Sequence, residues 1–205
     1  MLSAGHYQIL STLSREGSKS RTELAQFLGL SKATISGLVR DLLDKDILSE
    51  RELVFGVGRP SVSLAVRADA AWFIGISMQD DPMVLVLTDL HGTVHARVEL
   101  PRPTDPDECI SALARATEQL RQTMGEAGDK LSGIGIALPG FVSRDRHTCV
   151  ACTALGWRDV NIGTAMAEKT GLPTWVENDA KALILGEELF GPLRGSPDFS
   201  MVFVS

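Results

Sequence analysis

The chain has 205 residues, of which 44% are hydrophobic and 22% charged, so it is long enough for one or two ordinary globular domains. No apolar run approaches the roughly 20 residues that span a bilayer, no secretory signal is visible, and three cysteines are too few for a disulfide framework. We therefore expect a cytoplasmic protein with reduced thiols and no membrane partner. The formal net charge of -6 would disfavour nucleic acid if it were evenly spread.

The charge is unevenly distributed along the chain. Residues 1–67 hold nine Lys and Arg against seven Asp and Glu, and the remainder holds eleven against nineteen. A slightly basic first part permits DNA binding but does not by itself indicate it. The evidence must come from the pattern of residues.

The first two predicted helices are short and amphipathic. The first ends near Glu16–Ser18, and the second begins at Ser20, which forms a capping-box pair with Glu23. Gly29 can adopt the positive φ that ends a helix. The residues expected to face the core are Ile9, Leu10, Leu13, Leu24, Phe27 and Leu28.

A third helix is predicted to begin directly after Ser31. Its apolar residues recur at i, i+3, i+4, i+7 and i+8 and form one buried face, consisting of Ile35, Leu38, Val39, Leu42 and Leu43. The opposite face carries small and basic residues: Lys32, Ala33, Ser36, Gly37 and Arg40. Two helices joined by so short a turn, the second with a small and basic outer face, are typical of a helix-turn-helix.

A short hairpin completes a winged helix-turn-helix. Residues 61–66 alternate between polar and apolar, and Gly56–Pro60 would form the exposed tip of the wing. We expect residues 1–67 to bind double-stranded DNA, with Arg59 entering a minor groove. The predicted DNA-binding residues are Ser31, Lys32, Ala33, Thr34, Ser36, Arg40 and Arg59. The alternative is a three-helix domain that contacts another protein.

Residues 70–205 are predicted to form an α/β domain. Three strand-like runs at 72–78, 83–88 and 93–100 suggest an antiparallel meander, and a helix from about Pro106 to Met124 follows. Residues 133–138 are typical of a buried parallel strand. The rest is predicted as a helix at 162–170, a strand at 174–177, a helix at 180–189 and a final strand at 199–205.

This order resembles one lobe of the ribonuclease H-like fold of actin-like ATPases. The sequence also resembles the ROK family of sugar kinases and sugar-responsive repressors, in whose repressor branch a winged helix precedes the sugar domain. The segments that carry the resemblance are Gly58–Pro60, Gly133–Gly140, Leu155–Trp157 and Gly171–Pro173 leading to Glu177–Ala180. The fold class is therefore α/β, with a winged helix-turn-helix followed by a partial ribonuclease H-like ROK domain.

The resemblance implies a sugar site where a strand ends and a helix begins. In this family an Asn-Asp pair holds sugar hydroxyls, and the matching residues are Asn178 and Asp179. From the residues alone, the alternative is that both merely cap the following helix. Pro139 and Gly140 end a strand at the same edge of the sheet, and Glu177 precedes the pair, so these five residues are the predicted ligand-binding set.

Catalysis, cofactors and metals are not expected. Family kinases hold phosphate with an Asp-x-Gly-Gly-Thr type loop, but this chain has Ser77–Asp81 at the matching place, without glycines and with two carboxylates. Cys149 and Cys152 have metal-ligand spacing but lack a second pair, so we interpret them as ordinary thiols. Trp157 and Trp175 are expected in the core or a cleft wall, and 144–147 as a solvated turn.

The resulting hypothesis is a sugar-responsive repressor of carbohydrate metabolism. A homodimer would place two recognition helices on a palindromic operator, and a sugar or sugar-phosphate effector would alter DNA affinity. Two alternatives are a ROK-type sugar kinase and a constitutive DNA-binding protein with a domain used only for association. Because a second lobe is almost absent, we also expect a fragment, a shortened product or a completing partner, with an exposed edge at 201–204.

Overall fold

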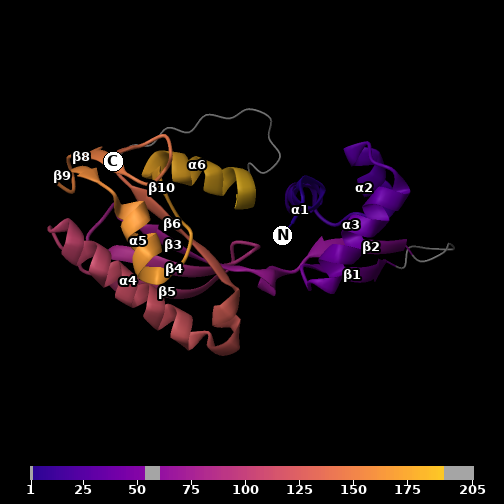
Figure 1. The fold of residues 1–205 in the computed structure, drawn as a ribbon, viewed down its shortest axis with the longest axis horizontal. Helices are drawn as coiled ribbons and strands as arrows, with labels where there is room; N and C mark the ends of the chain where they lie inside the picture. Colours follow the sequence, from indigo (N-terminus) through magenta and orange to yellow (C-terminus); the bar gives the residue numbers. More distant parts are fainter. Residues whose placement is uncertain (1, 54–60, 192–205) are drawn as a thin grey trace. The chain divides into compact units, whose positions relative to one another are not determined.

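The computed structural model describes residues 2–53 and 61–191, which divide into two compact units between Ala70 and Ala71 (Figure 1). The predicted wing tip at 56–60, including Arg59, and the predicted strand at 199–205 lie outside the described residues. Among the described helices there is none that combines the length and the apolar character needed to cross a bilayer.

The N-terminal unit contains three helices and a two-stranded ribbon. Its elements are α1 (Ala4–Glu16), α2 (Arg21–Leu28), α3 (Lys32–Asp44), β1 (Leu48–Leu53) and β2 (Ser61–Val66), followed by the short helix η1 (Ala68–Ala70). β1 and β2 are antiparallel, with Leu48 opposite Val66. The side chains of Ile9, Leu24, Ile35, Leu42 and Leu64 are fully buried and form the centre of this unit.

The predicted helix ends are confirmed. The Ser20 hydroxyl accepts a hydrogen bond from the Glu23 amide at 3.3 Å, and the Ser20 amide donates to the Glu23 carboxylate at 2.7 Å. The Ser20 hydroxyl also donates to the Glu23 carboxylate at 2.8 Å, and the bonds that this carboxylate accepts from the Ser20 amide and hydroxyl hold the pKa of Glu23 below its usual value. Gly29 ends α2 in the left-handed region at φ 65°, and the Ser31 hydroxyl accepts from the Thr34 amide at the start of α3.

The expected core position of Phe27 is wrong. Its side chain is 58% exposed, whereas Leu24 and Ala25 are buried. In an α-helix Leu24, Ala25 and Leu28 fall on one side, and Phe27 lies roughly 100° from the centre of that side. The Phe27 ring instead lies 5.5 Å from the Lys19 ammonium, which is favourable for a cation on an aromatic face.

The second unit is built on a five-stranded sheet in the order β10-β6-β3-β4-β5. The strands are β3 (Trp72–Ser77), β4 (Met83–Asp89), β5 (Val94–Leu100), β6 (Leu131–Leu138) and β10 (Thr174–Asn178). β3, β4 and β5 form the predicted antiparallel meander, and β6 is parallel to both β3 and β10. Parallel strands that point the same way bring the ends of β6 and β10 to one edge of the sheet.

The turn between β4 and β5 is organised by the buried carboxylate of Asp89. One oxygen accepts from the amides of His91 and Thr93, and the other lies 2.8 Å from His95 Nε2. Burial raises the pKa of Asp89, but the hydrogen bonds from His95, Thr93 and His91 outweigh it and hold the pKa below its usual value. The carboxylate therefore stays ionised and fixes the turn.

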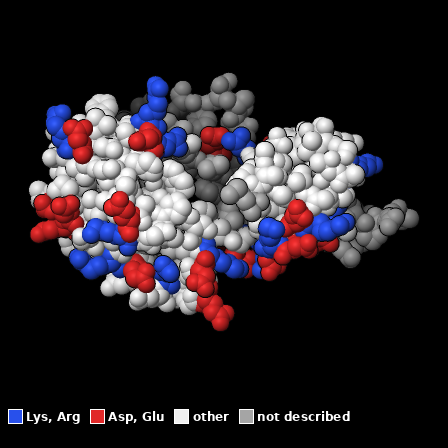
Figure 2. Space-filling model, in the orientation of Figure 1, with Lys and Arg blue, Asp and Glu red and all other residues white. Residues whose placement is uncertain are grey.

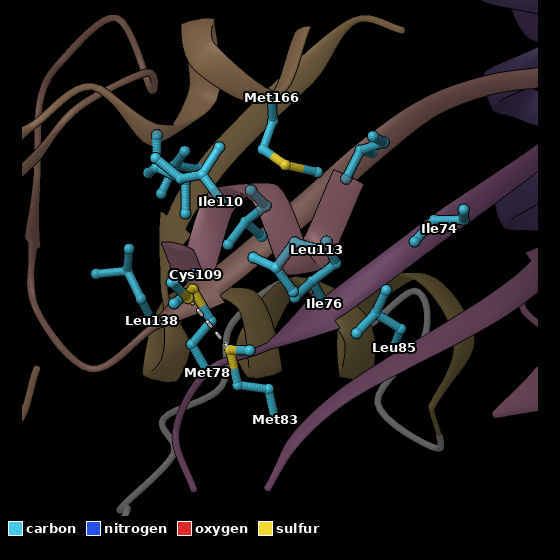
Figure 3. Packing of buried hydrophobic residues seen from close by; sticks show 14 of the residues in the cluster. Ile74, Ile76, Met78, Met83, Leu85, Cys109, Ile110, Leu113, Leu138 and Met166 are labelled. Carbon is cyan, nitrogen blue, oxygen red and sulfur yellow. Dashed lines mark hydrogen bonds between the residues drawn. The ribbon is translucent and has the colours of Figure 1, made fainter. Parts of the chain in front are cut away.

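Helices cover both faces of the sheet. On one face lie α4 (Pro106–Thr123) and α5 (Ile162–Thr170), and on the other lies α6 (Asp179–Phe190) (Figure 1). Between α4, α5 and the sheet is the main apolar core, in which Ile76, Met78 and Leu113 face one another (Figure 3). The thiol of Cys109 donates to the sulfur of Met83 at 3.6 Å within it. A short helix, η2 (Gly125–Lys130), connects α4 to β6.

A small three-stranded sheet, not predicted from the sequence, lies between β6 and α5. It contains β7 (Phe141–Val142), β8 (Cys149–Cys152) and β9 (Trp157–Val160), in the order β7-β8-β9. Strands of two to four residues are too short to give a recognisable periodicity. Trp157 is buried here, as expected, and its indole N–H donates to the Thr104 carbonyl. Burial raises the pKa of the Cys149 thiol to about 11.

Candidate functional site

The outer face of α3 is the candidate nucleic-acid interface. Lys32, Ala33, Thr34 and Arg40 are exposed and Ser36 is half-buried, because Ile35, Val39 and Leu42 turn the other face of the helix into the core. Within the part of the chain that the structure describes, neither Lys32 nor Arg40 has a carboxylate partner. Both cations are therefore available for phosphate groups.

Two of the predicted residues also have a structural role. The Ser31 hydroxyl accepts from the Thr34 amide at 3.1 Å, and the two hydroxyl oxygens lie 2.8 Å apart. Ser31 thus caps α3. Its hydroxyl can contact DNA only through the hydrogen-bonding capacity that these two contacts with Thr34 leave free. Arg59, the predicted minor-groove residue, lies outside the described residues.

Several charges elsewhere on the N-terminal unit are paired. Arg21, at the first position of α2, donates to Glu50 of β1 at 2.7 Å, and Arg67 pairs with Asp46 and Asp69. Figure 2 shows acidic and basic side chains interspersed along the edge of this unit at which β1 lies. Arg21 and Glu50 are 29 positions apart, so no local sequence pattern predicts their ion pair. Lys45 and Arg51 likewise have no carboxylate partner among the described residues, so the α3 face is distinguished by its small and basic side chains and not by unpaired cations alone.

The second candidate site lies where β6 and β10 end. These parallel strands place Asn178 opposite Leu138, so the Pro139–Gly140 segment and the Asn178–Asp179 pair meet at one edge of the sheet. The side-chain amide of Asn178 donates to the Gly140 carbonyl at 3.2 Å. Four of the five predicted ligand residues are thus brought together.

Asn178 and Asp179 are only partly occupied by contacts within the protein. The Asn178 carboxamide oxygen accepts from the Lys181 amide at 3.3 Å, so Asn178 does cap α6. One Asp179 oxygen accepts from the Ala180 amide at 2.8 Å. The other Asp179 oxygen and one Asn178 N–H have no partner among the described residues, so together they offer an acceptor and a donor to a ligand.

The Glu177 carboxylate contacts this pair only through the Asn178 backbone amide. Side chains alternate along β10, so Glu177 lies with Trp175 on the face that α6 covers, whereas Val176 is in the main core. The Glu177 carboxylate lies 3.4 Å from Arg146 Nε and 3.9 Å from Lys181 Nζ. It also accepts a hydrogen bond from the backbone amide of Asn178. In the neighbouring turn, residues 144–146 are exposed as expected, whereas His147 is half-buried. The Val176 amide donates to the Arg146 carbonyl and fixes the turn to β10.

A cavity of about 540 Å³ lies between α6 and the sheet. Its walls are mostly apolar, with Trp175 and Phe190 as the aromatic residues and Glu177 and Arg146 as the charged ones. Small residues leave the space open, because a Cβ atom at Gly135 or Gly186 would meet no atom within 4 Å. No sequence pattern predicts this cavity, since it depends on how α6 crosses the sheet.

The loop after β3 is held by an arginine. The Arg102 guanidinium donates to the carbonyls of Met78, Gln79 and Asp80 at 3.0 to 3.4 Å, and the Arg102 amide donates to the Asp81 carboxylate. A loop that binds phosphate must turn its backbone N–H groups toward the ligand. Here the carbonyl groups converge on a side chain of the protein itself.

Comparison with known proteins identifies the family. Residues 73–205 match the family model described as the ROK family. The chain belongs to the ROK family. Residues 2–63, ahead of the ROK region, match the model of the MarR family, which agrees with the winged helix-turn-helix. The predicted family and fold class are thereby confirmed.

ROK proteins similar to this chain include two repressors. The xylose repressor of Bacillus subtilis (strain 168) is 29% identical over 193 residues, covering 91% of this chain and 49% of that protein. The DNA-binding transcriptional repressor Mlc of Escherichia coli (strain K12) is 27% identical over 198 residues, covering 92% and 47%. This ROK chain therefore spans about half the length of the curated relatives it matches.

A solved structure supports the same likeness for both units. The crystal structure of a ROK family transcriptional regulator, a homologue of the E. coli MLC protein, aligns with a TM-score of 0.75 and 25% identity. The alignment covers 90% of this ROK chain and 48% of that one.

Proposed function

We propose that the chain is a sugar-responsive transcriptional repressor. The observation that carries the proposal is the unpaired outer face of α3 in a winged helix-turn-helix that leads, within a few residues, into a ROK unit. The xylose repressor and Mlc are similar to this chain across both units. The first unit binds operator DNA, and the second binds a sugar that regulates it.

DNA binding follows from the chemistry of α3. The helix enters the major groove, where the small side chain of Ala33 permits close approach and the hydroxyls of Thr34 and Ser36 contact base edges or phosphates. Lys32 and Arg40 neutralise phosphates, so affinity falls as salt rises. A homodimer would present two such helices to the half-sites of a palindromic operator.

Sugar binding is assigned to the edge formed by β6 and β10. The free oxygen of Asp179 accepts from a sugar hydroxyl and the remaining Asn178 N–H donates to another, in a partly desolvated site beside Gly140. A sugar regulates DNA binding only if it binds one arrangement of the protein better than another.

We infer that the chain does not phosphorylate sugars. The carbonyls of the loop after β3 are bonded to Arg102, and Asp80 and Asp81 would repel a phosphate there. A coupled assay of ATP turnover with a panel of hexoses tests this inference. Measurable phosphorylation that is abolished by Asp179→Ala would show that the chain is a kinase.

The repressor proposal is tested by DNA binding and its response to sugars. Selection from randomised duplexes identifies a preferred sequence, and fluorescence anisotropy compares it with a scrambled duplex at fixed salt. We expect preference for the selected duplex and a shift in affinity with D-xylose, D-glucose or another monosaccharide of the panel. Equal binding of both duplexes contradicts DNA recognition. Specific binding that no sugar alters leaves the constitutive DNA-binding alternative.

A further inference from the structure

Phe141 is the most exposed large apolar side chain of the described residues. Its side chain is 77% exposed, although the residue belongs to a strand, β7, whose neighbour Val142 packs against the main core. A single exposed apolar residue needs no explanation by itself. The position of Phe141 does need an explanation, because this residue directly follows Gly140, which contacts Asn178.

The backbone that presents Phe141 is rigidly held. A Cβ atom at Gly140 would lie 2.7 Å from the Ala151 carbonyl oxygen, so β8 packs directly on this glycine. The Cys152 thiol donates to the Pro139 carbonyl at 3.1 Å, and Phe141 pairs with Ala151 in the β7–β8 ladder. The phenyl ring is thus carried by a fixed strand and not by a loose loop.

The same segment is connected to the proposed hydroxyl-binding pair. Since Asn178 Nδ2 lies 3.2 Å from the Gly140 carbonyl oxygen, peptide geometry puts the Phe141 Cα within about 6 Å of that nitrogen. The Phe141 Cα therefore lies within one sugar's width of a free N–H, and Asp179 with its free oxygen is the residue after Asn178 in the chain. An apolar ring and a few polar groups at one place form the usual composition of a small-molecule site.

We propose that Phe141 is the apolar platform for the sugar ring and determines which sugars bind. A pyranose has hydroxyls around its rim and C–H groups on its faces, so the rim bonds to Asn178 and Asp179 while one C–H face packs on the phenyl ring. The ligand class is a pyranose with one face free of axial hydroxyls, since an axial hydroxyl would be buried against carbon without a partner. This inference rests on the proposed sugar-binding function.

The test measures sugar affinity by calorimetry in the full chain, with D-xylose and D-glucose as probes. Phe141→Ala is expected to weaken binding by roughly tenfold, as truncation of an aromatic anchor does, and Phe141→Tyr to stay close to wild type. Val150→Ala, which removes another exposed apolar side chain in the same small sheet, is the matched control and should leave affinity unchanged. Because Phe141 is exposed, Phe141→Ala should keep the wild-type melting temperature.

The outcomes distinguish the platform from the function on which it rests. If the wild type binds sugar and Phe141→Ala binds it equally well, the platform is wrong while the sugar site stands. If Phe141→Ala changes only the oligomeric state by light scattering, the ring belongs to a protein contact and the platform is again wrong. If the wild type binds neither these sugars nor any other of a monosaccharide panel, the sugar-binding function and the platform fail together.

Discussion

Substitution of Asn178 separates its two roles, the helix cap and the ligand contact. In Asn178→Ala, α6 loses the acceptor for the Lys181 amide, which costs about 1 kcal/mol for a helix N-cap. The Gly140 carbonyl also loses its donor, and since both groups are half-buried this adds roughly 0.5 to 1 kcal/mol. We therefore expect the second unit to be destabilised by about 1.5 to 2 kcal/mol. Asn178→Ser keeps an acceptor for the cap and should lose only the smaller part.

The assay uses the distribution of tryptophans in the chain. Trp72, Trp157 and Trp175 are its three tryptophans and all lie in the second unit, so their fluorescence in urea reports the unfolding of that unit. Both variants should lose sugar affinity by roughly tenfold if the carboxamide N–H binds a hydroxyl. If Asn178→Ala is as stable as the wild type, Asn178 does not cap α6. If Asn178→Ser binds sugar as tightly as the wild type, Asn178 serves only as a helix cap.

Three further predictions concern the interface, the core and pH. Lys32→Ala should lower the slope of log affinity against log salt by about one, measured by anisotropy, whereas Lys169→Ala in α5 should leave the slope unchanged. If Lys32→Ala has the same slope as the wild type, Lys32 does not contact a phosphate in the interface. Leu24→Ala should destabilise the N-terminal unit by about 2 to 5 kcal/mol, and Phe27→Ala by less than about 0.5 kcal/mol, because only Leu24 is buried. Unfolding is followed by far-ultraviolet circular dichroism, and similar losses of stability in the two variants would contradict the orientation of α2. Since the folded-state pKa of Asp89 is lowered, its stabilisation is fully present above the unfolded pKa of about 3.9 and is lost as pH falls through the folded value. The gap in urea stability between wild type and Asp89→Asn, about 2 kcal/mol at pH 7, should thus close in acid; a gap that is independent of pH would exclude this carboxylate as the cause.

Local chemistry made much of the fold predictable from the sequence. The pair Ser20 and Glu23 marks the start of α2 because its hydrogen bonds join residues three positions apart, and Gly29 marks the end because it adopts a positive φ. The meander of β3, β4 and β5 has strands of six or seven residues, long enough for a pattern to appear. The orientation of Phe27 was missed because an eight-residue helix with three large apolar residues does not define its buried side.

The sequence by itself determined the order of the helices and of the longer strands, the outward face of α3 and the residues that cap the helices, since these depend on neighbours within one or two turns. Only the tertiary structure decided which of the candidate ligand residues meet. Asn178 and Gly140 are 38 positions apart and are joined by the parallel pairing of β6 and β10, whereas the adjacent Glu177 is turned by strand alternation toward Arg146 on the other face. Proximity along the chain does not predict proximity in a site, because packing of the sheet determines which side chains share a face.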